Sequence, residues 1–249
     1  MSKPLVSIVI PTFNRYESLM LAIESIENQS FQDYEIIIIN DASTDERYNN
    51  LNKINKTKII NLEKNSVREN GYFSDSIRNY GIDAANGKYI AFLDDDDYWM
   101  PNKLELQIGK LETGEFNLTC SDAFANNGMY DVRLTNKRFN QEIVFKEISD
   151  IYKKSKLKKI FVKRMNYKFE FPEIWDLKFI KVHNCIITSS VVVDKNLIVQ
   201  IGKFRDIQTK KLYSDWDCWL GLLTHTDCYY FSEPLIYYDL NDGMNKNTL

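Results

Sequence analysis

Glycine and proline are scarce in this chain of 249 residues, which contains 9 Gly and 5 Pro. An average protein has about 7% Gly and 5% Pro, roughly twice the share found here. This scarcity excludes collagen-like repeats and long disordered linkers, because both are rich in these residues. A chain of this length also buries enough surface to fold without disulfides or a structural metal. We therefore expect a well-filled globular protein of one domain.

The chain is also poor in the side chains that build zinc sites. Its four cysteines are scattered without a C-x-x-C pair, and its two histidines are His183 and His225. Structural zinc sites usually combine four Cys or His ligands at short spacings, so we do not expect one here. We interpret both histidines as ordinary polar or core residues. Scattered, unpaired cysteines are typical of a reduced, cytosolic protein.

Long apolar runs and an excess of charge of one sign are both absent. No stretch approaches the roughly 20 apolar residues that cross a bilayer, and the N-terminus lacks the apolar core of a signal peptide. Lys and Arg number 32 against 35 Asp and Glu, a net charge of −3. General nucleic-acid binders carry a strong basic excess. We therefore predict a cytoplasmic protein with no nucleic-acid partner.

Residues 153–168 are an exception to this even distribution of charge, with eight basic residues and no acidic one. A solvated helix face is the simplest interpretation of such a run. Apolar residues lie among the lysines, however, and a basic amphipathic segment can also rest on an anionic membrane or bind a phosphorylated acceptor. Peripheral membrane contact through residues 153–168 is therefore the alternative hypothesis.

Two patterns of apolar residues alternate over the first hundred residues: short continuous apolar runs, and apolar residues repeated at the spacing of a helix face. Between two apolar runs, Leu19, Ala22, Ile23 and Ile26 recur at the spacing of one helix face. Alternation of buried strands with helices predicts an α/β fold, with a Rossmann-like, mostly parallel central sheet and helices on both faces. The runs that we expect as strands are residues 5–10, 35–40, 58–62 and 88–93, and we expect the first two to be buried.

Capping boxes predict where helices start in the first half, whereas the second half of the chain shows a less regular alternation of strands and helices. Asn14 begins a variant of the capping box, and residues 43–46 form a Ser-x-x-Glu box that predicts another helix start. Small residues at Gly81, Ala84 and Ala85 mark a further helix face. In the second half we expect strands at 116–121 and 185–193, a helix at 215–223, and two short strands within 228–238, on either side of Pro234.

Polar side chains follow the strands of the first half at the points where the strands end. Thr12 and Asn14 follow the first strand, Asp41 the second, and four aspartates, residues 94–97, the fourth. Ligands of open α/β sheets bind beyond the carboxyl ends of the strands. We therefore expect a ligand site at this edge of the sheet.

The four consecutive aspartates at 94–97 suggest a cation site. Carboxylates held close together repel one another, which raises their pKa values and favours a bound cation. Oxygen ligands without His or Cys select a hard ion, Mg²⁺ or Mn²⁺. A solvated acidic loop is the alternative, but the run directly follows a buried strand and precedes Tyr98 and Trp99. We therefore favour the cation site.

Three other polar residues have both a functional and a purely structural interpretation. Asp41 can accept a hydrogen bond from a nucleotide base or ribose, or serve as a turn or cap residue. Arg78 can reach a diphosphate or lie on the surface. Asp215, beside Trp216 and Asp217, can act in catalysis, or simply be stabilised by the dipole at a helix N-terminus.

Motifs of several other nucleotide-binding enzymes are absent. The chain has neither the G-x-G-x-x-G of dehydrogenases nor the G-x-x-x-x-G-K-[ST] of P-loop enzymes. A phosphatase of the Asp-x-Asp type needs its nucleophile after the first strand, where this chain has Pro11 and Thr12. We do not expect the protein to belong to any of these classes.

Four segments, taken in order, resemble a family 2 glycosyltransferase with the GT-A fold. They are SIVIPTFNR, EIIIINDASTDE, SIRNYGIDAANGKYIAFLDDDDYWMPNKLE and SDWDCWLGLL. The resemblance covers essentially the whole chain and is strongest over residues 5–110. It implies a single GT-A domain, 1–249, in which 1–110 is the nucleotide-sugar-binding half and 111–249 the acceptor-binding half.

The resemblance also implies roles for individual residues. Asp96 matches the best metal ligand of the Asp-x-Asp motif, for Mn²⁺ or Mg²⁺, and Asp215 matches the family's general base. The residues that match the binding site for the nucleotide and donor sugar are Pro11, Thr12, Asn14, Arg15, Asp41, Arg78, Asp94 and Asp95.

The function implied is inverting, metal-dependent transfer of a sugar from a nucleotide-sugar donor to a hydroxyl acceptor. A UDP-sugar is the favoured donor, and the acceptor is a glycan, glycolipid or protein. The chain departs from the family pattern at Ser214 (usually Glu), Gly221 (often Arg), Asp239 (commonly Arg) and Asn241 (commonly His). These departures leave a catalytically silent nucleotide-sugar-binding module as the alternative. The oligomeric state stays open.

Overall fold

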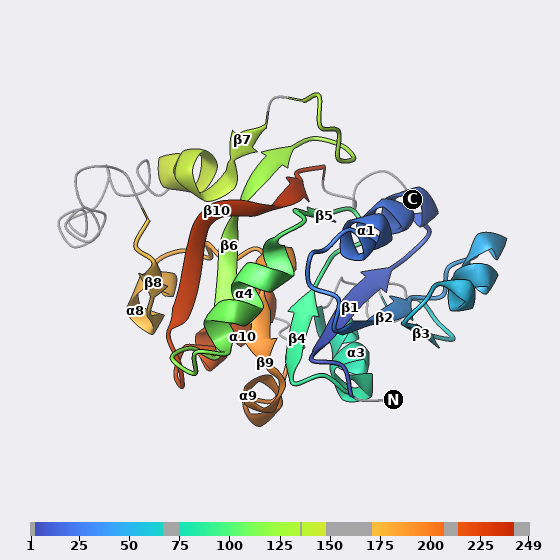
Figure 1. Ribbon diagram of the computed structural model, residues 1–249, viewed down its shortest axis with the longest axis horizontal. Helices are drawn as coiled ribbons and strands as arrows, with labels where there is room; N and C mark the ends of the chain where they lie inside the picture. Colours follow the sequence, from blue (N-terminus) through green and yellow to red (C-terminus); the bar gives the residue numbers. More distant parts are fainter. Residues whose placement is uncertain (1–2, 67–74, 135, 148–170, 207–213, 242–249) are drawn as a thin grey trace.

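The computed structural model describes residues 3–66, 75–134, 136–147, 171–206 and 214–241 (Figure 1). Within these residues the chain forms an α/β domain around one ten-stranded sheet. The basic run 153–168 lies outside the described residues, and with it both the solvated helix face and the alternative of a membrane contact. Among the residues that are described, no helix combines the length and apolar character needed to span a membrane.

The first half of the chain forms the parallel part of the sheet. Its strands pair in the order β3-β2-β1-β4, and every pair is parallel. All four strands predicted from the apolar runs are therefore confirmed. The strands are β1 (Val6–Thr12), β2 (Tyr34–Asn40), β3 (Thr57–Asn61) and β4 (Tyr89–Phe92). The helices among them are α1 (Tyr16–Glu27), the 3₁₀ helices η1 (Glu46–Lys53) and η2 (Asp75–Ile77), and α3 (Arg78–Ala84).

The second half extends the sheet with strands of both directions. The strands are β5 (Tyr98–Trp99), β6 (Leu118–Asn126), β7 (Lys137–Arg138), β8 (Ile174–Trp175), β9 (Val192–Asp194) and β10 (Cys228–Asp239). β9 is antiparallel to both β4 and β6, whereas β10 is parallel to β6 and antiparallel to β5 and β8. β7 is antiparallel to β6. The sheet is thus mixed, with its continuous parallel part in the first half.

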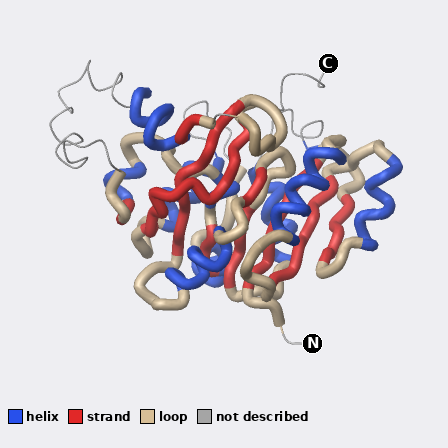
Figure 2. Tube along the Cα trace, turned by 45° about the horizontal axis from the view of Figure 1, so that its top comes forward, coloured by secondary structure: helices blue, strands red, loops and turns tan. Residues whose placement is uncertain are grey.

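Helical segments cover both faces of the sheet. In Figure 2 the strands run side by side through the molecule with helices around them. One apolar core lies between the sheet and α1, η1 and α4, and the other between the sheet and α3, α8, α9 and α10. The remaining bounds are α4 (Lys103–Leu111), η3 (Phe139–Val144, a π-helix), α8 (Leu177–Ile180), η4 (Thr188–Ser190, 3₁₀), α9 (Lys195–Gln200) and α10 (Ser214–Leu222).

Helices α1 and α3 pack as their spacing predicts. The apolar stripe of α1 is buried, including Leu19 and Ile23. On α3, a Cβ added to Gly81 would lie 2.5 Å from Cγ1 of Val9 on β1, well inside van der Waals contact. Only glycine lets α3 approach β1 this closely. The small-residue helix face is therefore confirmed at Gly81, and Ala85 is buried beside it.

Neither predicted capping box forms. Arg15 is at the N-cap of α1 without a side-chain bond, and Asp45 caps η1 by accepting a hydrogen bond from the Arg47 amide at 2.9 Å. Asn14 has a left-handed backbone, with φ of 51°, and its Oδ1 accepts from the Thr44 amide at 2.9 Å. The Asn14 amide in turn donates to the Ser43 hydroxyl at 3.0 Å. Both side chains therefore tie two loops together instead of capping helices.

Two strand predictions in the second half are wrong in detail. The run 185–193 is not one strand, because η4 interrupts it and leaves only β9. The run 228–238 is one strand, β10, rather than two. Proline cannot donate to a neighbouring strand, and the register of β10 against β6 shifts on both sides of Pro234. The strand therefore bulges at this proline instead of ending.

Candidate functional site

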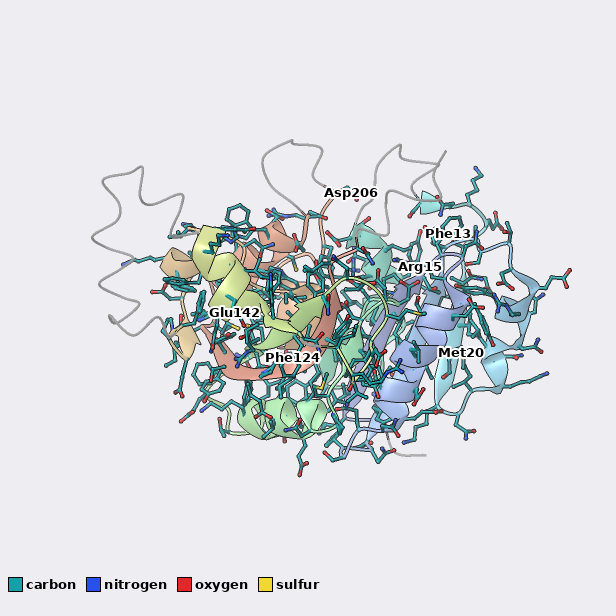
Figure 3. The ribbon with its side chains drawn as sticks, turned by 90° about the horizontal axis from the view of Figure 1, so that it is seen from above. Phe13, Arg15, Met20, Phe124, Glu142 and Asp206 are labelled. Atoms are coloured by element: carbon teal, nitrogen blue, oxygen red, sulfur yellow. The ribbon has the colours of Figure 1, made fainter. Side chains whose placement is uncertain are left out.

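The predicted site residues lie at the carboxyl ends of β1, β2 and β4 and at the starts of α3 and α10. Figure 3 shows the molecule from above the view of Figure 1 and labels Phe13 and Arg15 in the loop that leads into α1. From this loop, Arg15 forms ion pairs with the acidic segment 94–97. The structure thus brings together polar residues that are far apart in the sequence.

Arg15 forms ion pairs with two of the four aspartates. Its NH2 lies 2.8 Å from Oδ1 of Asp95, and its NH1 lies 2.5 Å from Oδ2 of Asp96. The Asp95 side chain is completely buried, whereas that of Asp96 is 20% exposed. Since Asp95 and Asp97 are both buried, the interpretation of this segment as a solvated acidic loop is wrong.

Burial, together with repulsion between neighbouring carboxylates, raises the pKa values of Asp95, Asp96 and Asp97. Burial raises the pKa of Asp95 to about 6, although the charge of Arg15 opposes the shift. Burial, followed by repulsion from Asp95, raises the pKa of Asp96 to about 7, again against Arg15. Burial and repulsion from Asp96 raise the pKa of Asp97 well above its ordinary value. The two guanidiniums of Arg15 and Arg78 do not balance four carboxylates, so the segment keeps negative charge that a further cation would stabilise.

The acidic segment offers few ligands to a metal ion by itself. Among the residues that the structure describes, no three His, Cys, Asp or Glu side chains are arranged to hold one. Asp94 is paired with Arg78, and Asp95 with Arg15. Asp96 is partly exposed and crowded by neighbouring carboxylates, which fits a single protein ligand to Mg²⁺ or Mn²⁺. Sites that use one or two carboxylates are completed by phosphates of the substrate and by water.

Tyr48 organises the loop after β1, a role that sequence analysis did not identify. Its hydroxyl is hydrogen-bonded to that of Thr12 at 2.9 Å and accepts from the Arg15 amide at 3.0 Å. Tyr48 itself is buried on η1. Pro11 lies within β1, opposite Ile39 of β2. The signal that could have identified Tyr48 is an aromatic residue in an otherwise polar segment.

Asp41 bonds to residues 24 and 25 positions further along the chain, rather than within a turn or helix cap of its own. Its carboxylate accepts hydrogen bonds from the Ser66 amide at 2.8 Å, the Ser66 hydroxyl at 2.7 Å and Nδ2 of Asn65 at 3.0 Å. The residue is buried, at 5% exposure. These bonds fix the chain after β3 against the end of β2. The role of Asp41 in holding a base stays a prediction.

Arg78 is buried between two carboxylates, so its interpretation as a surface residue is wrong. Its side chain is 3% exposed, with NH1 at 2.5 Å from Asp75 and NH2 donating to Asp94. Burial lowers the pKa of Arg78, but the charges of Asp94 and Asp75 outweigh this and raise it above its ordinary value. Arg78 therefore stays charged, close to the acidic segment.

Asp215 lies in the first turn of α10, largely buried. Its Oδ2 accepts from Nδ2 of Asn184 at 3.0 Å, and its Oδ1 from the Trp216 amide at 2.6 Å. Burial, followed by repulsion from Asp75, raises the pKa of Asp215 to about 6. A carboxylate with this pKa is ionised at neutral pH yet basic enough to take a proton.

Asp217, two residues further along α10, is in a different environment. Nε and NH2 of Arg205 donate to its two carboxylate oxygens at 2.7 and 2.6 Å. This bidentate pair occupies both oxygens of Asp217. Of the two aspartates beside Trp216, Asp215 is therefore the better candidate for proton transfer.

Ser189 supports the acidic segment from the second half of the chain, and the sequence did not indicate this role. Its hydroxyl accepts from the Asp94 amide at 2.9 Å. Its carbonyl accepts from Nε1 of Trp99, also at 2.9 Å. Asp75 and Asn184 were likewise not predicted. Serine and asparagine are common in loops, so their types carried no signal.

Comparison with known sequences gives a family and several relatives. A sequence model described as Glycosyl transferase family 2 matches residues 7–192. The UDP-Glc:alpha-D-GlcNAc-diphosphoundecaprenol beta-1,3-glucosyltransferase WfaP of Escherichia coli is 38% identical over 109 residues, 44% of this chain and 42% of that protein. The GalNAc(5)-diNAcBac-PP-undecaprenol beta-1,3-glucosyltransferase of Campylobacter jejuni is 32% identical over 186 residues, 67% of this chain and 56% of that protein. The chain thus matches about half the length of these relatives.

Solved structures with the same fold bind nucleotide sugars. Staphylococcus aureus TarS 1–349 in complex with UDP-GlcNAc matches 97% of this chain and 60% of that one, with a TM-score of 0.65 and 17% identity. The mannosyltransferase PcManGT from Pyrobaculum calidifontis, in complex with GDP-Man and Mn²⁺, matches 94% and 56%, with a TM-score of 0.60 and 13% identity. At such low identity the likeness bears on the fold alone, and it confirms the predicted GT-A fold.

Proposed function

The chain belongs to glycosyltransferase family 2, and we propose that it transfers a sugar from a nucleotide-sugar donor to a hydroxyl group. The single observation that carries this proposal is the position of Asp215. A carboxylate with a pKa raised to about 6 lies beside Asp75, which is paired with Arg78, itself paired with Asp94. This arrangement supports the proposal of a base for the acceptor close to cationic and acidic groups suited to a metal-bound diphosphate.

A UDP-sugar is the donor that we propose. The E. coli relative is named for UDP-Glc, and the TarS structure holds UDP-GlcNAc. On this chain, the loop after β1 with Thr12, Asn14 and Arg15 would receive the nucleoside. Asp41 would accept a hydrogen bond from the base, which requires part of its bonding to Asn65 and Ser66 to be exchanged. Asp94 and Asp95 would face the ribose and the donor sugar.

The proposed reaction is a single displacement with inversion at the anomeric carbon. The acceptor oxygen forms a bond to that carbon as the bond to the diphosphate oxygen breaks. Asp215 takes the proton of the acceptor hydroxyl on the face opposite the departing nucleoside diphosphate. One carboxylate base suffices, because the leaving diphosphate needs neutralisation of charge rather than a proton.

The leaving group gains negative charge during this step. Arg78, held charged between Asp75 and Asp94, and Arg15, beside Asp95 and Asp96, are two positive groups at this edge of the sheet. A divalent cation, Mn²⁺ or Mg²⁺, held by Asp96 and the two phosphates would supply Lewis-acid stabilisation of the departing diphosphate. The raised pKa of Asp96, about 7, supports this assignment, because crowded carboxylates favour a bound cation.

A lipid-linked glycan is the acceptor that we propose. Two relatives, from E. coli and C. jejuni, are named for acceptors on diphosphoundecaprenol or PP-undecaprenol. Such an acceptor is held in a membrane, so the enzyme would work at a membrane surface. Its site for the acceptor would lie in the half of the chain that carries Asn184 and Asp215.

The experiment that tests the function is an assay of UDP release. UDP-Glc and UDP-GlcNAc are supplied with Mn²⁺ or Mg²⁺, with and without alpha-D-GlcNAc-diphosphoundecaprenol. We expect release that depends on Asp215 and is stimulated by the acceptor. Binding of nucleotide without release from either donor would favour the alternative, a silent nucleotide-sugar-binding module, to which the departures at Ser214 and Asp239 point.

A further inference from the structure

Asp75 connects two parts of the site that are distant in the sequence. It begins η2 and lies three residues before Arg78, the first residue of α3. Its Oδ1 is 2.5 Å from NH1 of Arg78. Its Oδ2 accepts a hydrogen bond from the hydroxyl of Ser214, 139 residues later, and its amide donates to the same hydroxyl at 3.3 Å.

These contacts form a continuous series from the acidic segment to α10. Asp94 is paired with Arg78, Arg78 with Asp75, and Asp75 with Ser214, the first residue of α10. The Asp75 side chain is only 15% exposed and that of Arg78 only 3%. Both groups are therefore largely removed from water, where ion pairs are screened less and breaking one is costly.

We propose that Asp75 is a positioning residue of the active site, which holds Arg78 toward Asp94 and fixes the start of α10, where Asp215 is presented. The inference rests on the proposed function of Asp215 as the base. Asp75 carries no other assignment, and it does not need to touch either substrate. Through Arg78 it acts on the part of the site proposed for the diphosphate. Through Ser214 it acts on the start of α10, which presents Asp215.

The departure at Ser214 gives this role a chemical reason. In this chain position 214 contributes a hydroxyl, and the carboxylate beside it comes from Asp75 on a different element. A carboxylate placed at the N-terminus of a nine-residue helix is stabilised by the helix dipole. The negative charge at the start of α10 therefore comes from Asp75 on η2, and the same carboxylate pairs with Arg78.

The charged groups around Asp215 show what removal of Asp75 would do. From η2 the charge of Asp75 raises the pKa of Asp215, and from α3 the charge of Arg78 lowers it. In the segment after α8, the uncharged amide of Asn184 donates a hydrogen bond to Asp215. The neighbouring His183 lies with its Nε2 3.6 Å from Glu147. On α10 itself, Asp217 is paired with Arg205. Neutralising Asp75 therefore lowers the pKa of Asp215.

The test is Asp75→Asn, which keeps the size of the side chain and removes its charge. We measure the pH profile of UDP release from UDP-Glc and, independently of turnover, the titration of Asp215. The titration uses ¹³C-carboxyl-labelled aspartate, with the Asp215 signal identified by its loss in Asp215→Asn. We expect kcat to fall about tenfold, and both the acid limb and the titration midpoint to move to lower pH.

Two further variants make the result specific. Asp83→Asn is the matched control, since Asp83 is also on this side of the sheet, on α3, but pairs with Lys203 at the surface. Asp83→Asn should leave unchanged both the midpoint of the acid limb of the pH profile and the midpoint of the Asp215 titration. Ser214→Ala removes the hydrogen bond and keeps the charge of Asp75. It should lower kcat by a smaller factor, with the acid limb near its original pH.

The outcomes separate this inference from the proposed function. If Asp215→Asn turns over normally, the proposed base is wrong, whatever Asp75 does. If Asp215→Asn is inactive while Asp75→Asn keeps the kcat and the Asp215 midpoint of the unmodified protein, the role of Asp75 is overturned. Should Asp75→Asn not fold, full activity of Ser214→Ala would overturn it equally.

Discussion

Arg15 and Asp96 are in contact, with NH1 of Arg15 lying 2.5 Å from Oδ2 of Asp96, 81 residues further along the chain. One partner follows β1 and the other follows β4, the strand beside it in the sheet. The acidic segment is therefore already partly neutralised by the protein's own cation. A metal ion bound at Asp96 would have to share this carboxylate with Arg15 or displace it.

Asp96→Ala should abolish the effect of metal on nucleotide binding. We expect UDP to bind the unmodified protein more tightly with Mn²⁺ than without, and to bind Asp96→Ala equally weakly in both conditions. Isothermal titration calorimetry with UDP, at fixed salt, measures both. Asp227→Ala is the control, since Asp227 is exposed just before β10, at the opposite end of the sheet. Metal-dependent binding at full strength in Asp96→Ala would reassign the metal ligand.

Asp215→Asn should separate binding from chemistry. Asparagine keeps the shape of the side chain but cannot take a proton, so we expect UDP to bind normally while transfer falls by about 10²–10⁴. Calorimetry and UDP release give the two quantities. The matched control is Asp217→Asn on the same helix, which alters an ion pair with Arg205 and should keep most of the activity. A large loss in both variants would indicate a structural role for this helix start.

The rate should depend on pH through the ionisation of Asp215. A general base works only when deprotonated, and the pKa of Asp215 is raised to about 6. We therefore expect kcat to be nearly constant above pH 7 and to fall about tenfold per pH unit below 6. Rates of UDP release between pH 4.5 and 8 at saturating donor, with stability checked at each pH, measure this limb. A midpoint near 4, the ordinary range of aspartate, would be inconsistent with a buried base.

Gly81→Ala should destabilise the protein through overpacking. The added Cβ would lie 2.5 Å from Cγ1 of Val9 and 3.0 Å from Cδ1 of Ile39, both on buried strands. We expect a loss of about 1–3 kcal/mol in the free energy of unfolding, measured by urea denaturation. Gly109→Ala is the control, because Gly109 is exposed on α4 with nothing within 4 Å of an added Cβ. That change should stabilise by up to about 1 kcal/mol.

The sequence predicts the parallel half of the fold well because there the signal is local. Each of the four strands in this half is a short apolar run, and the α1 stripe and Gly81 follow directly from helical spacing. The capping boxes fail because Asn14 and Ser43 bond to each other's loops, a tertiary contact that local spacing cannot contain.

The candidate site is predictable to a similar, partial degree. The acidic segment and Asp215 stand out because carboxylates at strand ends and helix starts are informative by type and place. Their partners are not informative in this way, because Asp75 bonds to Ser214 across 139 residues and Tyr48 bonds to Thr12 across 36. Such partners are determined by how the elements pack, which no motif in the chain describes.

Ser189 has a consequence for how the chain can be divided. It lies 95 residues after Asp94, yet it accepts hydrogen bonds from the amide of Asp94 and from the indole of Trp99, on both sides of the acidic segment. A fragment ending before this serine would contain three of the four segments that resemble family 2 glycosyltransferases, and would still lack two bonds that hold its aspartates in place. The first 110 residues are thus not a transplantable module, and a chimera that joins them to the second half of a related protein would need to bring Ser189 and η4 with them.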